Sequence, residues 1–152
     1  MTTRNTTRED TINNLKRLFT DQKLAVLSTQ KAGQPYANLV AFSFSKDLRY
    51  LYFLTPEDTR KYENLAACDR VALLIHSAAN REEDFSDAMA VTALGKAETV
   101  KDKSAHLKNF LARHPRLAEF SEKLTTVMIR IEIESFVTVN RFQNVVELRM
   151  DR

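Results

Sequence analysis

The sequence predicts a mainly β protein of the α+β class, in which a small antiparallel barrel, closed or partly closed, carries flanking helices. Two observations predict this fold. About seven or eight segments have the alternation or short apolar runs of strands, against about three or four helical segments. Short turns join most successive strands, which favours antiparallel pairing over the crossovers of a doubly wound sheet. The 152 residues suit one domain, spanning 1–152.

The chain is expected to begin with a helix over Arg8–Thr20. The segment from Thr7 to Asp10 resembles a capping box, with Thr7 as the N-cap and Asp10 in place of the usual glutamate. Apolar residues then follow at helical spacing: Ile12, Leu15, Leu18 and Phe19. We expect residues 1–22 to form an N-terminal helical segment that packs on the barrel.

Strands are expected to fill most of the first half of the chain, at Leu24–Thr29, Tyr36–Phe44, Arg49–Thr55 and Arg70–His76. Gly33 can take a positive φ in the first turn, and Pro35 opens the second strand, where it costs least. Pro56 ends the third strand, and a short helix is expected from there to about Ala67. The second strand alternates, so that one face holds Asn38, Val40, Phe42 and Phe44 and the other Ala37, Leu39, Ala41 and Ser43.

The second half combines strands with helices. Residues 78–87 form a polar, acidic connection to a strand over Met89–Val100, in which Gly95 indicates a β-bulge or a close approach of two backbones. Helical spacing predicts a helix over Asp102–His114 and a second short one from Pro115. The last strands are expected at Val127–Glu134, where the alternation is cleanest, and in a final hairpin of Phe136–Asn140 and Val145–Leu148.

Composition excludes several functions. The chain has 2 glycines where average usage would give about ten, so neither a dinucleotide fingerprint nor a P-loop can be built. The net charge is +3, and the basic residues are dispersed among acidic ones, so we expect no nucleic-acid partner. A single cysteine, and an N-terminus without a hydrophobic core, fit a cytoplasmic protein. No segment is long and apolar enough to predict a membrane span.

The segment Leu54–Lys61 is the strongest candidate for a binding site. A strand ends there and a helix begins, which supplies unpaired N–H groups and the positive end of a helix dipole. Two hydroxyls and two adjacent positive charges accompany this helix start: Thr55, Thr59, Arg60 and Lys61. Together they could bind a phosphate without glycine. The alternative is a solvated helix start, favoured by Glu57 and Asp58, because two carboxylates would repel an anion.

Several segments carry a wider resemblance. In chain order they are Leu24–Thr29 with Gly33–Tyr36, Tyr50–Thr55 with Thr59-Arg60-Lys61, Asn64-Leu65, Asp69–Leu74 and Ala93–Glu98. They are similar to the opening hairpin, the aromatic strand with its Ser/Thr-Arg-Lys phosphate motif, and the following helix and strands of the pyridoxamine 5′-phosphate oxidase-like family of FMN-binding split barrels. The resemblance covers about Leu15 to Leu148. It implies an antiparallel split β-barrel of about six to eight strands with flanking helices.

The resemblance also implies a homodimer with FMN bound between the two subunits. Arg60 and Lys61, with Thr59, would hold the FMN phosphate. Leu54 and Thr55 would lie beside the ribityl chain or the ring. The isoalloxazine would contact, partly through backbone groups, the strand residues Asn38, Leu39, Val40 and Ala41. The alternative for these strand residues is ordinary barrel core.

The sequence departs from the pyridoxamine phosphate oxidases of this family in three places. The C-terminal segment 146–152 lacks the Arg-x-His element that serves their substrate. Ala90 stands where they use a glutamine to contact FMN, and Asn38 and Ser43 stand where they have arginine and lysine. The resemblance therefore implies an FMN-binding protein, while these departures make vitamin B6 oxidation doubtful.

Two functions of different classes follow. The first is a flavin-dependent oxidoreductase, in which the flavin carries electrons or hydride, so that few catalytic side chains are needed and none can be named. The second is a non-enzymatic dimer that carries flavin or haem as a sensor or carrier module. No metal site is expected, because the histidines lack the paired spacing of metal ligands: His76, His106 and His114.

Overall fold

The computed structural model describes residues 7–140 and 144–150. Residues 1–6 of the expected N-terminal segment, the turn of the final hairpin at 141–143 and the last two residues of the C-terminal segment lie outside this description. The helices are α1 (Arg8–Asp21), α2 (Arg60–Ala67), α3 (Asp84–Asp87), α4 (Ser104–Arg113), the 3₁₀ turn η1 (Pro115–Leu117) and α5 (Ala118–Glu122). The strands are β1 (Leu24–Lys31), β2 (Gln34–Ala41), β3 (Ser43–Phe44), β4 (Tyr50–Pro56), β5 (Arg70–His76), β6 (Ala90–Thr99), β7 (Thr126–Asn140) and β8 (Asn144–Arg149).

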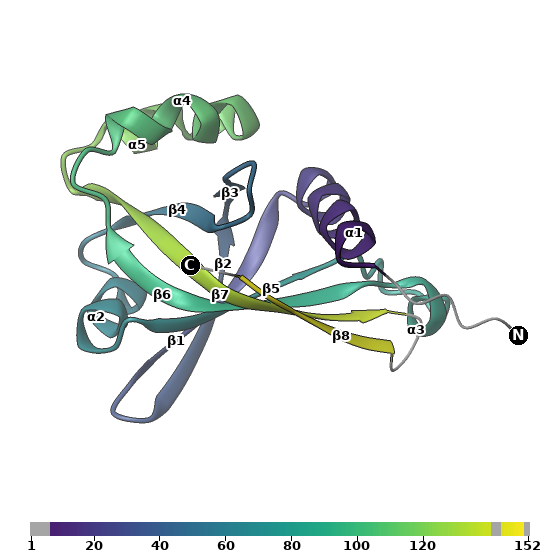
Figure 1. The fold of residues 1–152 in the computed structure, drawn as a ribbon. Coiled ribbons are helices and arrows are strands. Elements are labelled where there is room, and N and C mark those ends of the chain that lie inside the picture. The colour runs from purple at the N-terminus through teal and green to yellow at the C-terminus, as the bar shows by residue number, and fades with distance from the viewer. Residues whose placement is uncertain (1–6, 141–143, 151–152) are drawn as a thin grey trace, which may run out of the picture.

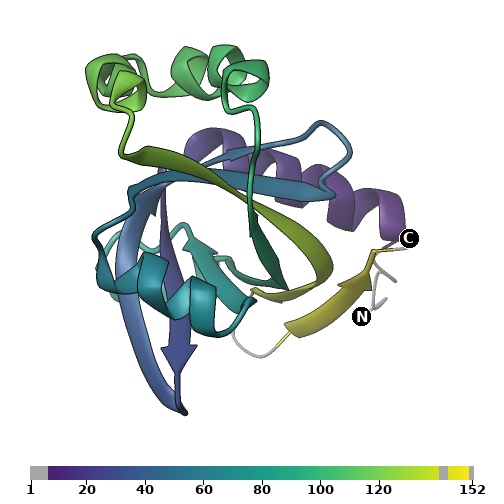
Figure 2. The ribbon, with the colours of Figure 1, turned by 90° about the vertical axis from the view of Figure 1, so that its left-hand side faces the viewer.

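The described strands form one 8-stranded sheet, in the order β2-β1-β5-β6-β7-β4-β3, with β8 paired to β7. Each of these pairs is antiparallel. The sheet curls around an apolar interior, so that β2 approaches β4 across the open side (Figures 1 and 2). The helices α4 and α5 lie above β4, and α2 packs beside β1. The predicted antiparallel barrel, partly closed and with flanking helices, is confirmed.

Strand β7 is the centre of the sheet because it pairs with three neighbours. Of its 15 residues, those within Ile129–Val139 form the ladder with β6 on one edge, while on the other edge Thr126–Glu132 pairs with β4 and Ser135–Asn140 pairs with β8. The prediction of two separate strands, Val127–Glu134 and Phe136–Asn140, is therefore wrong. The apolar alternation does change phase there, but the cause is a β-bulge with Glu134 as the extra residue, and the strand continues.

Gly95 lies on β6 opposite this bulge. The register shifts between Leu94 and Gly95. A Cβ atom added at Gly95 would overlap the carbonyl oxygen of Glu132 and would lie 3.0 Å from a methyl carbon of Ile131. Both features that the sequence suggested for Gly95, a bulge and a close backbone approach, are confirmed. The two strands can come this close because glycine has no side chain.

The predicted strand Tyr36–Phe44 is interrupted at Phe42, which belongs to neither β2 nor β3. The Phe42 carbonyl accepts hydrogen bonds from Nε of Arg113 at 3.2 Å and from Nε2 of His114 at 2.7 Å, so it is withdrawn from the ladder. Arg113 also donates to two carbonyls at the end of α1, at 2.9 and 2.8 Å. The predicted alternation persists through the break, because Phe42 is buried in the same core as Val40.

Aromatic rings fill the middle of the core. The ring of Phe19, on α1, lies 5.8 Å from those of Phe42 and Phe136 and 5.6 Å from that of Phe44. The contacts with Phe42 and Phe44 are edge-to-face, the arrangement that aromatic quadrupoles favour. A second, smaller cluster joins α4 to the outer side of β4 and β7, and its buried members are Leu54, Phe110 and Met128.

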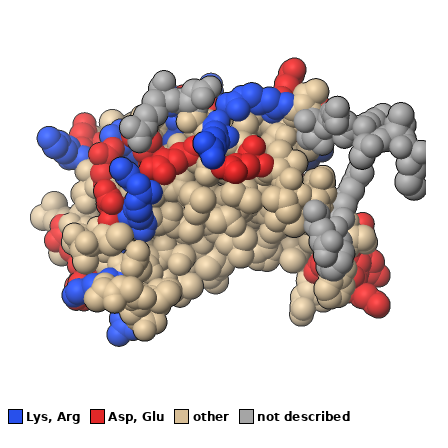
Figure 3. Space-filling model, turned by 60° about the horizontal axis from the view of Figure 1, so that its bottom comes forward, with Lys and Arg blue, Asp and Glu red and all other residues tan. Residues whose placement is uncertain are grey.

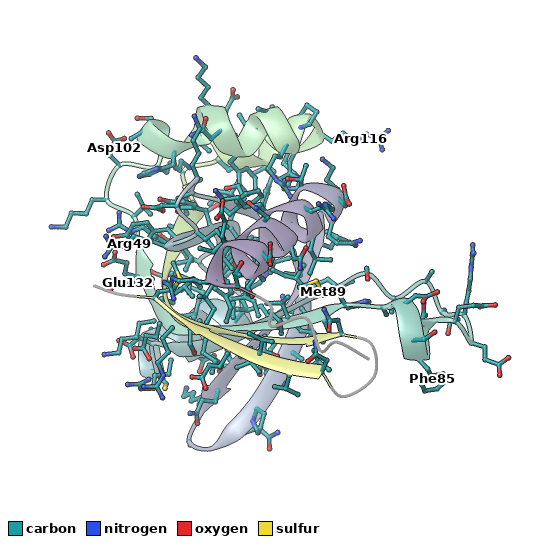
Figure 4. All side chains as sticks on the ribbon, turned by 45° about the vertical axis from the view of Figure 1, so that its right-hand side comes forward. Arg49, Phe85, Met89, Asp102, Arg116 and Glu132 are labelled. Carbon is teal, nitrogen blue, oxygen red and sulfur yellow. The ribbon has the colours of Figure 1, made fainter. Side chains whose placement is uncertain are left out.

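Most of the remaining elements follow the prediction within two residues, but α2 begins at Arg60, later than the start expected directly after Pro56. Thr7 caps α1 through both hydrogen bonds of the capping box. The acidic connection 78–87 contains the short helix α3, which projects from one end of the sheet with Phe85 on its outer side (Figure 4). In the part of the chain described here, no helix has the length and apolar character needed to cross a membrane.

We predict that Gly95→Ala destabilises the fold by about 2 kcal/mol or more, because the new methyl group meets backbone that cannot move aside. Gly33→Ala is the comparison: Gly33 has a φ of 79° and open space around it, so the change costs about 1 kcal/mol of backbone strain alone. Urea unfolding of both variants measures the difference. Equal losses of unfolding free energy in the two variants would contradict the close approach at Gly95.

We predict that stability falls with pH below neutrality through His114. Burial lowers the pKa of this imidazole below 6.5, and the positive charges of Arg113 and Lys23 lower it further. As the pH falls through 6.5, the unfolded chain therefore binds the proton before the folded protein does. The free energy of unfolding then decreases by at most about 1.4 kcal/mol per pH unit. His114→Gln, which can still donate to the Phe42 carbonyl, should flatten this slope in unfolding titrations between about pH 5 and pH 7. An unchanged slope would contradict the assignment.

Candidate functional site

The turn from β4 into α2 is built by threonine hydroxyls. Thr59 is the N-cap of α2, and its Oγ1 accepts a hydrogen bond from the Tyr62 N–H at 3.2 Å. The same hydroxyl lies 3.1 Å from the Pro56 carbonyl oxygen and 3.0 Å from Oγ1 of the fully buried Thr55. The two hydroxyls therefore fix the shape of the turn and set the direction in which the helix begins.

Arg60 and Lys61 are the first two residues of α2, so their charges lie at the positive end of its dipole. Within the described residues neither one makes a hydrogen bond or an ion pair. The guanidinium of Arg60 lies over the ring of Tyr36, 5.3 Å from its centroid. Lys61 is half-buried, and burial lowers the pKa of its ammonium group. Two cations without anionic partners at one helix start are suited to a bound anion.

The carboxylates near this turn differ in position. Glu57 and Asp58, which the sequence analysis counted against an anion site, are exposed to solvent. Glu63, in the first turn of the helix, is held by an ion pair with Lys31 at the end of β1. None of the three forms an ion pair with Arg60 or Lys61 in the described part of the chain.

The β2 strand presents alternate residues to the open side of the half-barrel. Tyr36 and Asn38 are paired with Thr29 and Leu27, whose side chains are buried inside the sheet, so both face inward. They are about 7 Å apart along the strand, which places Asn38 close to the Tyr36–Arg60 stack. The Oδ1 atom of Asn38 is buried and has no hydrogen-bond donor among the described residues.

The structure separates the other predicted residues from this inner group. Val40 also points inward but is buried in the main core. Leu54 is buried beneath α4 in the second cluster, and Ala41 packs against the same cluster. Leu39 is 63% exposed on the opposite face of the sheet. The inner group therefore consists of Asn38, Thr55, Thr59, Arg60 and Lys61, whereas the side chains of Val40 and Leu54 belong to the two apolar clusters.

Leu39 belongs to a broad apolar face on the outer side of the sheet. Val26 on β1 pairs with Leu39 on one side and with Leu74 on the other, which gives a row of aliphatic side chains across three strands. Leu24, Leu74 and Leu94 are 52%, 38% and 39% exposed. Figure 3 shows this face as a wide area without Lys, Arg, Asp or Glu. A patch of this kind is typical of a surface that another protein covers.

Sequence reasoning missed two residues at this site, Tyr36 and Lys31, since both act through contacts between β-strands and α2. The inward alternation shared with Asn38 could have identified Tyr36. No sequence signal marks the pairing of Lys31 with Glu63, because they lie 32 residues apart. No group of three or more His, Cys, Asp or Glu side chains suited to a metal ion is found within residues 7–140 and 144–150.

The curled antiparallel sheet, divided where β4 and β8 part along β7, defines a split barrel. A model of the family described as pyridoxamine 5′-phosphate oxidase matches residues 12–140. The chain belongs to this family, as the sequence predicted. A comparison with curated proteins finds no match.

Solved structures share the fold at low identity. A haem-binding protein from Mycobacterium smegmatis matches with a TM-score of 0.82 and 14% identity, over 94% of this chain and 59% of that one, so this chain spans little more than half of its length. General stress protein 26 from Bacillus anthracis matches with a TM-score of 0.72 and 18% identity, over 92% and 98% of the two chains. An FAD-binding protein from Mesorhizobium loti matches with a TM-score of 0.67 and 19% identity, over 83% and 91%.

Proposed function

We propose that this protein binds FMN and acts as a flavin-dependent oxidoreductase. The observation that carries the proposal is the pair of cations at the start of α2, Arg60 and Lys61, which have no anionic partner in the described structure. A phosphate monoester with about two negative charges would offset both charges and the cost of burying Lys61. Membership of the pyridoxamine 5′-phosphate oxidase family, and a structural neighbour that binds FAD, support a flavin as the rest of the ligand.

Whether the inner face of β2 fits such a ligand depends on the hydrogen-bonding groups of Asn38. Its Nδ2 group donates to the Leu39 carbonyl at 3.4 Å, which leaves Oδ1 as the inward acceptor without a donor. A buried acceptor left unpaired costs about 1–3 kcal/mol, so a ligand that supplies an N–H or O–H group would be stabilised there. The imide N–H of an isoalloxazine and the hydroxyls of a ribityl chain are such donors. The residues present therefore fit a flavin.

The bound flavin would supply the capacity to transfer hydride or electrons. The roles left to this chain are binding and orientation. Arg60 and Lys61 would hold the phosphate, and Thr55 and Thr59 would shape the turn that presents them. Asn38 would anchor the polar part of the flavin, and the backbone of β2 from Leu39 to Ala41 would line its ring. The absence of the Arg-x-His element and of the glutamine at Ala90 supports a substrate other than a B6 vitamer.

We further propose a homodimer in which the apolar outer face of the sheet is covered by a second copy, with FMN near the interface. The aliphatic row of Leu39, Val26 and Leu74 supports this assembly, since solvent exposure of such a row is unfavourable. The row begins at Leu39, next to Asn38 on the same strand. A partner on the outer face would therefore lie against the strand that lines the flavin site.

The alternative is a haem-binding module, which the Mycobacterium smegmatis neighbour suggests. The hydrogen bonds of two histidines favour flavin instead. Nε2 of His114 is engaged with the Phe42 carbonyl, and Nδ1 of His76 accepts the Ala78 N–H at 3.1 Å. A neutral imidazole that accepts at Nδ1 carries its proton on Nε2, which opposes iron ligation at that nitrogen. The absorbance of the purified protein separates the two ligands, through flavin bands or a Soret band.

We predict that Arg60→Ala/Lys61→Ala weakens FMN binding by about 100-fold, because two charge-assisted contacts to the phosphate are lost. Riboflavin, which lacks the phosphate, should bind the double variant and the wild type equally. Quenching of flavin fluorescence measures both affinities. Unchanged FMN affinity in the double variant would contradict the phosphate assignment.

Asn38→Leu provides the matched control, since it should weaken FMN and riboflavin to the same extent. The variant loses the long 3.4 Å hydrogen bond from Nδ2 to the Leu39 carbonyl but also removes the unpaired Oδ1, so the stability of the ligand-free protein should change little.

We predict that Leu74→Glu converts the dimer to a monomer at micromolar concentration, because it places a charge at the centre of the apolar face. Leu124→Glu is the control, since Leu124 is 97% exposed and lies outside that face. Sedimentation equilibrium measures the mass of each variant. A wild type that is monomeric, or a Leu74→Glu variant that remains dimeric, would contradict the assignment of this face.

A further inference from the structure

Glu63 is a potential competitor of the phosphate. It lies three residues after Arg60 on α2, and residues at this spacing are neighbours on a helix surface. The positive charge of Arg60 already contributes to lowering the pKa of the Glu63 carboxyl, after the larger effect of Lys31. A carboxylate free to pair with Arg60 would neutralise the guanidinium that the proposed function assigns to the phosphate.

Lys31, at the end of β1, already occupies this carboxylate. Its ammonium group forms an ion pair with Oε1 of Glu63. Lys31 is the last residue of β1, opposite Gln34 in a hairpin closed by a tight turn in which Ala32 and Gly33 have φ values of 52° and 79°. The turn therefore fixes the point from which the lysine side chain extends.

A buried hydrogen bond fixes the helix relative to this hairpin. Nδ2 of Asn64 donates to Oγ1 of Thr29 at 3.0 Å, and both side chains are buried. Asn64 is the residue next to Glu63, and Thr29 lies two residues before Lys31. The ion pair thus spans two segments that are already fixed relative to each other, so only side-chain freedom is lost when it forms.

We propose that Lys31 is a positioning residue of the phosphate site: by pairing with Glu63, it occupies that carboxylate and so leaves the guanidinium of Arg60 to a phosphate-bearing ligand. This inference rests on the proposed function. It requires that the effect of Lys31 on ligand affinity depends on the presence of Glu63. A lysine that only attracted the phosphate through its own charge would act independently of Glu63.

The experiment is a double-mutant cycle read by equilibrium binding of FMN and riboflavin. Lys31→Met should weaken FMN binding by about two- to fivefold, the range expected for exposed charge pairs, and should leave riboflavin unaffected. In a Glu63→Gln background the same change should have no effect on FMN affinity, because position 63 then carries no carboxylate that could pair with Arg60. Lys46→Met, at an exposed turn lysine, controls for the loss of one positive charge. High salt should reduce the effect of Lys31→Met.

The possible outcomes separate this inference from the proposed function. If Lys31→Met weakens FMN binding equally in the wild-type and Glu63→Gln backgrounds, or no more than Lys46→Met does, the positioning role is overturned. If the wild type binds FMN no more tightly than riboflavin, the phosphate site itself fails. A loss of FMN affinity that Glu63→Gln abolishes supports the positioning role.

Discussion

The contact between Gly95 and the backbone of β7 is the constraint on which the rest of the barrel depends. It lies where β7 changes partners, with β4 along its first part and β8 along its last. The extra residue at Glu134 bends the strand there, and the missing side chain at Gly95 lets β6 follow the bend. Without this close approach β4 and β8 could not diverge along one strand, and the sheet would lack the division that opens its interior.

Because successive side chains point to opposite faces of a sheet, the edge strand β2 contributes to two surfaces. Inward residues of β2, Tyr36 and Asn38, face the cations of α2, while Leu39 on the same strand belongs to the apolar outer face. The break at Phe42 ends this strand, and Arg113 ties the break to the end of α1. The position of the candidate site is therefore set by contacts from three separate parts of the chain.

The features that the sequence predicted correctly are local. The capping box at Thr7 and the change from strand to helix within Leu54–Lys61 depend on a few neighbouring residues, and the alternation of β2 depends on its own side chains. The failures have distant causes. The interruption at Phe42 requires Arg113, which is 71 residues away, and the continuity of β7 requires a bulge that sequence alternation cannot distinguish from a turn. The assignment of site residues to FMN stays a prediction, although the structure brings five of the nine together.

The central place of β7 also determines when the barrel can form during synthesis. Both β4 and β6 are made before it, and each has one ladder edge that only residues 126–140 can fill. A nascent chain that ends before residue 126 therefore has unpaired strand edges and exposed apolar side chains, whatever local helices it has formed. Strands β7 and β8 complete the sheet, so the barrel can close only after these two strands have emerged from the ribosome.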